Sequence, residues 1–500
     1  MPTLIDDYVP PTIDFDNTYA RELDGLYTPW QPAVVPAPRL VRLNQSLAAE
    51  LGLDAAALAG EAGARLFSGA ELPAGATPIA QAYAGHQFGG FSPQLGDGRA
   101  LLVGELIDRH GKRRDIAFKG SGRTPFSRGG DGKAALGPVL REYIIGEAMH
   151  ALGIPTTRAL AAVTTGESVY RDQALPGAVL TRVAASHLRV GTFQYFAARN
   201  DLDNLRRLTE YAIRRHDPAL TSDPDRYVLF LQAVAERQAA LIAQWMNVGF
   251  IHGVMNTDNM TISGETIDYG PCAFLEAYDP ATVFSSIDAQ GRYAFGNQPL
   301  IARWNLARLA ETLLPLIDPE KPERAVARVT EIIDAFPAWF EVPWLDGLRA
   351  KLGLTSTDDD DLALGTDWLA LLQQHHVDFT LAWRRLADAA AGDDAPLIAN
   401  TGEHTDLRDW LARWRARCAS EPIDARTRAQ SMRRVNPIYI ARNERVEEAL
   451  AAATHQSNFA PFEALLAAIE QPFDERAGLE RYAAPALAEV TARYQTFCGT

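Results

Sequence analysis

Three polar side chains near the middle of the chain have the types and spacing of a divalent-cation site. Asp258 and Asn259 are neighbours, and Asp268 follows shortly after them. Mg²⁺ takes oxygen ligands in octahedral geometry, and proteins usually hold it with one or two side chains together with substrate phosphate. The spacing therefore predicts that Asn259 and Asp268 hold a metal ion against the phosphates of a nucleotide.

The stretch 252–259 is similar to the catalytic loop of protein kinases, with one departure. In kinases the pattern His-Arg-Asp-x-x-x-x-Asn supplies a base and a metal ligand. Counted from His252, Asn259 falls at the metal position, but the base position is Val254. Valine cannot accept a proton, and the nearest carboxylate is Asp258. Either the chain is an inactive kinase, or it performs different chemistry on the same nucleotide.

The segment between Asn259 and Asp268 is expected to bring them together. Residues 261–263 and 266–267 predict two short strands joined at Gly264 and Glu265. Such a hairpin would fold Asp268 back beside Asn259.

Glycines and a lysine upstream are typical of a nucleotide site. The run 96–99 (Gly-Asp-Gly-Arg) precedes two predicted strands, and Ile116 to Lys119 matches the kinase strand whose lysine holds phosphates. Glycines let backbone N–H groups approach an anion, although a plain hairpin turn explains Gly96 and Gly98 equally well. The following loop, 120–133, interleaves Arg with Gly, and a flexible linker is its alternative.

Further charged residues follow in the order that a kinase site requires. Glu142 lies near the start of a predicted helix, where it could reach Lys119 as the corresponding glutamate does in kinases. Arg182 and Arg189 flank Ser186 and His187. These arginines are either planar, multi-donor phosphate ligands or ordinary surface residues.

Composition limits the class of protein. Five hundred residues, 47% of them hydrophobic, exceed what one core normally supports, so two or three lobes are expected. The net charge of −15 and pI near 5.2 argue against a general nucleic-acid binder. No apolar run reaches the ~18 residues of a membrane span, and the acidic start, 1–7, lacks leader features. We therefore expect a cytoplasmic protein without nucleic-acid or membrane partners.

The expected fold class is α+β. Strands are predicted at 100–106, 115–119, 157–164 and 178–183, with 169–170 as a candidate for a further strand, while 83–91 is predicted to be a packed loop. Helices are predicted at 43–51, 140–152, 193–198, 202–216, 227–248, 304–317, 323–336, 362–374, 378–390, 405–416 and 444–454. The aspartates at 358–361 fit the start of a helix better than a metal site.

These residues resemble the selenoprotein O family. The resemblance spans almost the whole chain and is carried by the segments 83–91, 94–106, 118–142, 181–191, 252–273 and 432–450. It implies a protein-kinase-like bilobal fold that binds ATP in a flipped orientation. AMP would then pass from ATP to Ser, Thr or Tyr hydroxyls of proteins, and pyrophosphate would leave.

The resemblance also implies segments and residue roles. It implies an N-terminal extension (1–75) packed on the core, a nucleotide-binding N-lobe (76–191), a C-lobe with the metal and catalytic loop (192–350), and a helical C-terminal extension (351–500). Asp258 would accept the proton, so the base need not occupy the Val254 position, and Lys119 with Glu142 would form the ion pair. Asn259 and Asp268 would bind Mg²⁺ or Mn²⁺. The nucleotide would be lined by Gly96, Gly98, Arg99, Lys119, Asp131, Gly132, Arg182, Arg189 and Asp268.

Cysteine usage gives no disulfide framework and no C-x-x-C metal site, because the chain has only three cysteines. The resemblance suggests that Cys272 and Cys498 form a redox pair that tethers the tail and restrains activity. The alternative is two reduced thiols, which a cytosolic compartment favours.

Three other functions remain open at this point. A conventional kinase or small-molecule phosphotransferase would transfer the γ-phosphate. A non-catalytic pseudokinase would bind nucleotide as a scaffold. A third enzyme would transfer UMP from UTP with manganese, because the residues do not distinguish adenine from uracil.

Overall fold

The structure is a computed structural model that describes residues 13–497, so the acidic start at 1–7 and Cys498 lie outside the described residues. The described chain divides into two compact units. Unit 1 contains residues 13–146 and 156–221, and unit 2 contains 147–155 and 222–497. The finer division into four segments stays a prediction.

Unit 1 is built on an eight-stranded sheet with the order β1-β3-β6-β7-β10-β9-β2, and β8 pairs with β10. Every strand pair in it is antiparallel. The strands are β1 (Tyr27–Pro29), β2 (Arg39–Leu43), β3 (Ile79–Gln81), β6 (Ala100–Ile107), β7 (Arg113–Lys119), β8 (Ala134–Ala135), β9 (Arg158–Tyr170) and β10 (Ala174–Ala184). The strands predicted from the apolar runs are therefore confirmed, and 169–170 is the end of β9.

Short helices cover the sheet of unit 1. Leu47 of α2 (Gln45–Glu50) and Phe67 of α3 (Glu61–Phe67) share one core with strand residues such as Val163 and Val183. The unit also holds α1 (Thr18–Glu22), α5 (Val190–Ala197), α6 (Leu202–His216) and the beginning of α4 (Leu136–Ala151).

The packed loop expected at 83–91 is wrong in part. Two short strands, β4 (Gly85–Gln87) and β5 (Gly90–Ser92), form a hairpin there. Phe88 and Gly89 at its turn both adopt positive φ angles, 51° and 86°. Such angles suit a two-residue hairpin turn, which a Gly- and aromatic-rich composition did not reveal.

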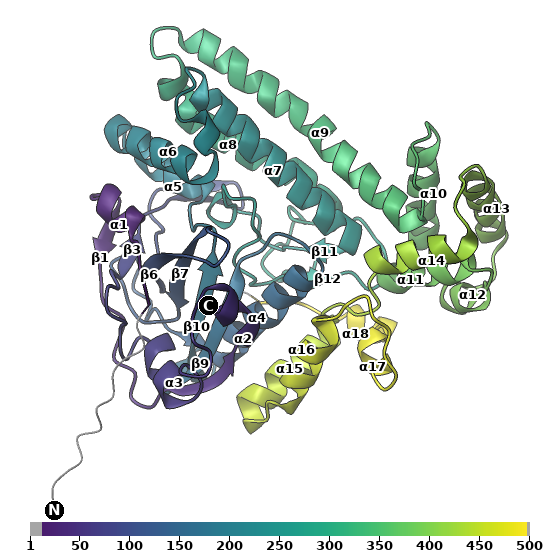
Figure 1. Cartoon of the computed structure of the whole chain (residues 1–500), viewed down its shortest axis with the longest axis horizontal. Helices are drawn as coiled ribbons and strands as arrows, with labels where there is room; N and C mark the ends of the chain where they lie inside the picture. The colour runs from purple at the N-terminus through teal and green to yellow at the C-terminus, as the bar shows by residue number, and fades with distance from the viewer. Residues whose placement is uncertain (1–12, 498–500) are drawn as a thin grey trace, which may run out of the picture. The chain divides into compact units, whose positions relative to one another are not determined.

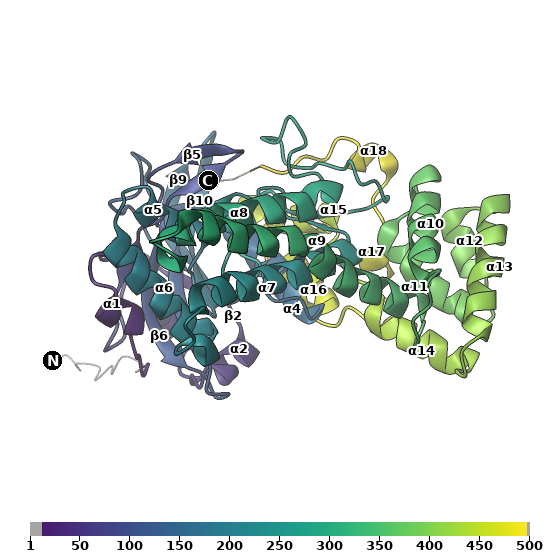
Figure 2. The same cartoon turned by 90° about the horizontal axis from the view of Figure 1, so that it is seen from above.

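Unit 2 is mainly helical. Helices α7 (Arg226–Val248), α8 (Gln298–Ile317) and α9 (Pro322–Leu352) run side by side (Figure 1). A further group of helices lies together in Figure 2: α10 (Asp361–Gln374), α11 (Phe379–Ala390), α12 (Ala395–Thr401), α13 (Thr405–Ala419) and α14 (Ala425–Val435). The chain continues through α15 (Asn443–Gln456), α16 (Ala460–Ile469), α17 (Glu480–Ala483) and α18 (Ala488–Thr491). The predicted α+β class and the large helical C-terminal region are thus confirmed, and the sheet is antiparallel.

Helix α9 is longer than the sequence predicted. The prediction ended at 336, yet the helix continues through Pro337 and Pro343, although proline lacks the N–H group that a helix interior uses. Packing along α7 explains the difference: Gly347 lies so close to Asn247 of α7 that an added Cβ would be 2.1 Å from its Nδ2. Tertiary contact here outweighs local propensity.

Candidate active site

Lys119 and Glu142 meet inside unit 1. Lys119 is the last residue of β7, and Glu142 lies in the second turn of α4. The Lys119 Nζ atom is 2.5 Å from Glu142 Oε2, and the two side chains are only 14% and 6% exposed. The pair can therefore present a cation held in place by a buried carboxylate.

Arg182 and Arg189 are not surface residues. Arg182, on β10, is buried, and its Nη1 donates to Glu142 Oε1 at 3.1 Å. Arg189 is also buried, and its guanidinium lies over the ring of Tyr83 at 4.5 Å. Burial of charge requires charged or polar partners, so the surface alternative is excluded for both residues.

The first glycine loop owes its glycines to close packing. A Cβ at Gly96 would lie 2.3 Å from the Phe126 ring, and one at Gly98 would lie 2.9 Å from the Phe126 carbonyl oxygen. The N–H groups of Gly96, Asp97 and Gly98 donate to protein carbonyls at 3.1, 2.9 and 2.8 Å. In this structure the loop is a packed turn, and its role in nucleotide binding stays a prediction.

The second loop, 120–133, is closed by its own backbone and is not a flexible linker. Ser121 and Lys133 form an antiparallel bridge, and Gly122 N–H donates to Gly132 O at 3.0 Å. Thr124 Oγ1 donates to Asp97 O of the first loop at 2.6 Å. The two loops therefore form one connected surface.

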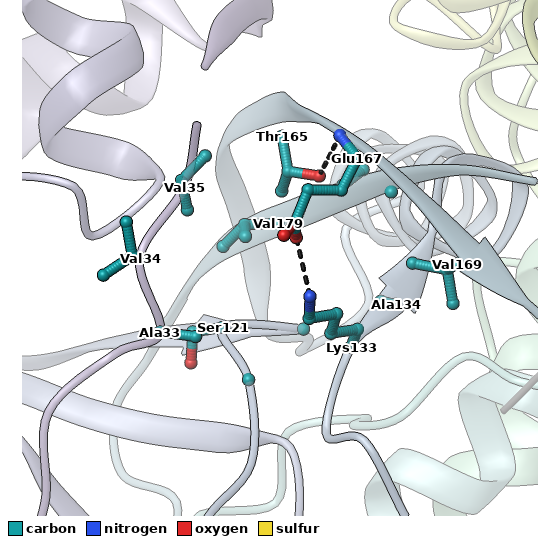
Figure 3. Close-up of a pocket in the computed structure, with 14 residues that line it drawn as sticks. Ala33, Val34, Val35, Ser121, Lys133, Ala134, Thr165, Glu167, Val169 and Val179 are labelled. Atoms are coloured by element: carbon teal, nitrogen blue, oxygen red, sulfur yellow. Dashed lines mark hydrogen bonds and ion pairs between the residues drawn. The ribbon is translucent and has the colours of Figure 1, made fainter. Parts of the chain in front are cut away.

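Asp131 lies on the outer part of this second loop. The Arg171 guanidinium donates a hydrogen bond to the Asp131 carboxylate at 2.9 Å, and this bond lowers the pKa of the Asp131 carboxyl. Behind the loop lies a small pocket with largely apolar walls, which the ion pair of Lys133 and Glu167 crosses at 2.7 Å (Figure 3). Arg99, beside the first loop, is half-buried.

The kinase-like loop of unit 2 follows α7 and the short strand β11 (Phe250–Ile251), which pairs with β12 (Ala273–Phe274). His252 is fully buried against the ring of Trp245, and its Nε2 donates to Ile267 O at 2.9 Å. Because Ile267 immediately precedes Asp268, His252 connects the loop to the aspartate. The buried Val254 N–H donates to His252 Nδ1 at 3.4 Å.

The hairpin expected between Asn259 and Asp268 is wrong. Instead of two strands, a tight turn forms in which Thr261 Oγ1 donates to Glu265 O at 2.7 Å and accepts from Glu265 N–H at 3.1 Å. A threonine hydroxyl thus replaces the backbone ladder that a hairpin needs, as Ser and Thr side chains often do in turns. The sequence pattern could not distinguish these two ways of pairing.

The residues expected to hold a metal have suitable donor atoms. Asn259 Nδ2 donates to Val254 O at 3.0 Å, so Oδ1 is the atom of this amide that could bind a metal ion. Asp268 has a left-handed backbone with φ +62°, a strained state for an aspartate that points to function. One carboxylate and one amide oxygen fit Mg²⁺, which completes its shell with water and phosphate. Within residues 13–497, no cluster of three His, Cys, Asp or Glu side chains offers another metal site.

Asp258 and Cys272 are both buried in unit 2. The tail reaches the residue before Cys272, because Thr496 Oγ1 donates to Pro271 O at 2.7 Å and Thr496 pairs with Ser285. The partner expected for Cys272 lies outside the described residues, so the redox pair stays a prediction.

The chain matches a known family along most of its length. A family model described as "Protein adenylyltransferase SelO" covers residues 11–470. The chain belongs to the SelO family. A protein named protein nucleotidyltransferase YdiU from Cereibacter sphaeroides is 62% identical over 490 residues, which are 98% of this chain and 100% of that relative.

Other relatives agree with this assignment. The protein of the same name from Chromobacterium violaceum is 61% identical over 474 residues, 95% of this chain and 99% of the relative. That from Rhizobium rhizogenes is 58% identical over 492 residues, covering 98% and 97%. This SelO-family chain is accordingly an enzyme of the nucleotidyltransferase class. Across residues 13–497 no helix combines the length and apolarity that a bilayer crossing needs.

Sequence reasoning missed several charged residues around the Lys119 pair. Glu105, Asp115, His187 and Arg215 are buried in unit 1 and bonded to one another. A signal was present, because Glu105 interrupts an otherwise apolar strand and Asp115 directly precedes the apolar run 116–118. Acidic residues are almost never fully buried unless they are paired, so each predicted a basic partner elsewhere in the chain.

Proposed function

We propose that the chain transfers AMP from ATP to Ser, Thr or Tyr hydroxyls of proteins and releases pyrophosphate, using a kinase-like fold. The family and its named relatives support nucleotidyl transfer. The fold proposal is supported by a lysine at the end of one strand of an antiparallel sheet, held by a glutamate on a neighbouring helix. Kinases require this same pair.

The observation that carries the proposal is the residue at the kinase base position. Val254 is buried and its side chain cannot take a proton. Asp258 is the only carboxylate between 252 and 260. A γ-phosphoryl transfer that uses the kinase base is therefore disfavoured. In a flipped ATP the α-phosphate faces the acceptor, so the base need not occupy the Val254 position.

The proposed step involves one bond formed and one broken. The oxygen of the acceptor hydroxyl attacks the α-phosphorus, the bond between that phosphorus and the bridging oxygen to the β-phosphate breaks, and pyrophosphate leaves with the bonding electrons. Asp258 receives the hydroxyl proton. General-base assistance of this kind is typically worth about 10² to 10⁴-fold.

The remaining residues act by position and charge. Lys119 and Arg182 donate to phosphate oxygens, which is effective because fixed donors in a buried site need no reorganisation. A divalent cation, held by Asn259 and Asp268, would neutralise charge on the phosphoryl oxygens. Arg99 and Arg189 offer further donors to the polyphosphate.

Labelled nucleotides test the proposal directly. The full-length protein is incubated with a protein acceptor and ATP labelled at either the α- or the γ-phosphate. We expect protein-bound α-label and free pyrophosphate. Retained γ-label would establish a kinase, absence of both labels would leave a nucleotide-binding scaffold, and preferential α-label from UTP with Mn²⁺ would replace AMP by UMP.

A pair of matched variants sharpens the assignment of the base. Asp258→Asn should reduce α-label transfer by about 10² to 10⁴-fold, because the amide cannot accept the proton. Asp359→Asn makes the same chemical change at an exposed site and should leave transfer unchanged. Equal transfer by both variants would remove Asp258 from the reaction.

A further inference from the structure

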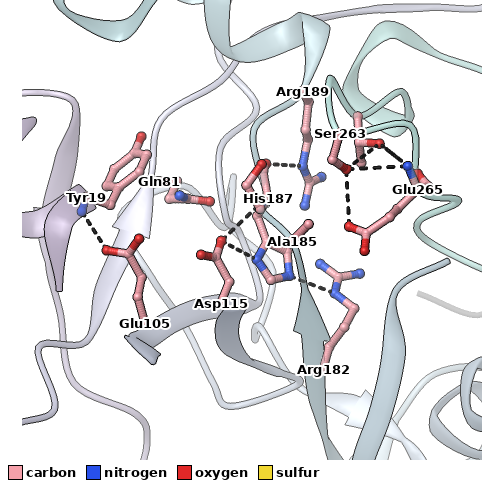
Figure 4. A network of polar contacts seen from close by, with 12 residues as sticks. Tyr19, Gln81, Glu105, Asp115, Arg182, Ala185, His187, Arg189, Ser263 and Glu265 are labelled. Carbon is pink, nitrogen blue, oxygen red and sulfur yellow. Dashed lines mark hydrogen bonds and ion pairs between the residues drawn. The ribbon is translucent and has the colours of Figure 1, made fainter. Parts of the chain in front are cut away.

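A continuous row of buried polar side chains crosses unit 1 behind the Lys119–Glu142 pair. Arg182 bonds Glu142 through Nη1 and, through Nε, donates to His187 Nε2 at 3.2 Å. His187 Nδ1 lies 2.9 Å from Asp115 Oδ2 (Figure 4). The row therefore runs from Lys119 to Asp115 without a break.

The direction of each hydrogen bond in this row is fixed by chemistry. The guanidinium of Arg182 can only donate, so His187 Nε2 must be the acceptor. The proton of the neutral ring then lies on Nδ1, which donates to the Asp115 carboxylate. Burial, aided by the charges of Arg182 and Arg189, lowers the pKa of His187 to about 4, which keeps the ring neutral.

Asp115 is itself anchored on its other side. Its Oδ1 is 2.5 Å from Arg215 Nη2 on α6, and Arg215 also pairs with Glu105 of β6. Glu105 accepts from the backbone N–H of Tyr19 at 2.6 Å. His187 is thus held by a carboxylate that β6, α1 and α6 fix together.

We infer that His187 is a positioning residue for the nucleotide site, fixing the Arg182 guanidinium and, through it, Glu142 and Lys119. The two oxygens of Glu142 are divided between Arg182 and Lys119. Only one rotation of the guanidinium lets Nε face His187 while Nη1 faces Glu142. This inference rests on the proposed function in so far as Lys119 and Arg182 contact phosphates.

A purely structural role for His187 predicts different behaviour. If the ring only fills space, its loss lowers stability but leaves the Michaelis constant for ATP unchanged in the protein that remains folded. If it positions Arg182, the loss of one hydrogen bond to a charged group weakens ATP binding about 10- to 100-fold.

Two substitutions and one control separate these roles. His187→Leu keeps much of the volume and removes both ring nitrogens. His187→Gln restores an oxygen that can accept from Arg182 Nε. The control, Ser186→Ala, removes a buried hydroxyl that bonds His216 at 2.8 Å, outside the row. Thermal unfolding, equilibrium ATP binding and steady-state α-label transfer are measured for each variant.

We expect His187→Leu to raise the ATP dissociation constant about 10- to 100-fold, His187→Gln to restore most of the affinity, and Ser186→Ala to lower only the unfolding temperature. In an Arg182→Lys background the His187→Leu change should add no further loss of ATP affinity, because lysine cannot bridge both partners. The inference would be overturned if both His187 variants bound ATP as tightly as Ser186→Ala does. It would also be overturned if the losses of ATP affinity in His187→Leu and Arg182→Lys were fully additive.

The binding measurement keeps this test apart from the proposed function. ATP affinity responds to the position of Arg182 whichever phosphate is transferred. Retained γ-label with weakened binding in His187→Leu would reject AMP transfer and keep the positioning role. If His187→Leu does not fold, His187→Phe, which keeps a ring but has no nitrogen to accept from Arg182, replaces it in the same comparisons.

Discussion

Substitution of Gly132 by alanine should open the second glycine loop of unit 1. Gly132 has φ +68°, and its Cβ would lie 2.1 Å from the Gly122 carbonyl oxygen and 2.6 Å from Arg123 N. All of these neighbours are backbone atoms, so no side chain can turn away. The bond from Gly122 N–H to Gly132 O, which closes the loop, cannot survive such a displacement.

The magnitude follows from two separate costs. An alanine held in the left-handed region costs about 1–2 kcal/mol, and overpacking at an unyielding contact adds about 1–3 kcal/mol. Gly129, in the same loop, provides the matched control, since its φ is +90° but nothing lies within 4 Å of its Cβ. Gly129→Ala should therefore cost only the first amount, and the difference between the variants measures the clash.

Thermal unfolding and ATP binding give the two measurements. A difference of about 2 kcal/mol corresponds to ~4–8 °C for a unit of roughly 200 residues. Because Asp131 and Gly132 are proposed to line the nucleotide, Gly132→Ala should also weaken ATP binding more than Gly129→Ala does. Identical unfolding temperatures and affinities for the two variants would refute the reasoning.

Two further predictions concern unit 2. Asp268→Gly should abolish nucleotidyl transfer yet raise the free energy of unfolding by about 1 kcal/mol, because glycine relieves a strained φ of +62°. Urea unfolding that shows lost stability would contradict this. Burial raises the pKa of Glu276 to about 6 despite its bond to Arg442. Its stabilising contribution is complete below the ordinary value of 4.5 and is lost as pH rises through 6. In urea unfolding, the free energy of unfolding of Glu276→Gln should therefore rise by about 2 kcal/mol relative to wild type between pH 4.5 and 7. A difference that does not change with pH would contradict the raised pKa of Glu276.

Much of the fold follows from local patterns. Apolar runs interrupted by turn residues predicted β6 and β7, and the 3.6-residue period predicted α6 with the bounds that the structure shows. Two predictions were wrong, one because of a tertiary contact and the other because of a side-chain hydrogen bond. The predicted helix stopped at 336, whereas α9 continues along α7, and residues 261–267 suggested strands where a threonine hydroxyl closes a turn.

The sequence predicted the Lys119–Glu142 pair of the site, but not the buried residues that hold this pair in place. Lys119 and Glu142 lie on a strand and a helix whose patterns are clear, so their order along the chain indicated the contact. Whether Arg182 was buried depended on which partner β10 receives in the sheet, and spacing alone does not contain that information. His187 was seen only as a neighbour of the arginines, because its two partners come from distant parts of the sequence.

The charges of the buried row in unit 1 balance one another. Lys119, Arg182 and Arg215 carry three positive charges, and Glu142, Asp115 and Glu105 carry three negative charges. With a neutral His187, the row sums to zero before any nucleotide binds. It can orient donors toward phosphate, but it adds no net charge to offset a polyphosphate. We propose that Arg99 and Arg189, together with a divalent cation, supply the positive charge that the row lacks.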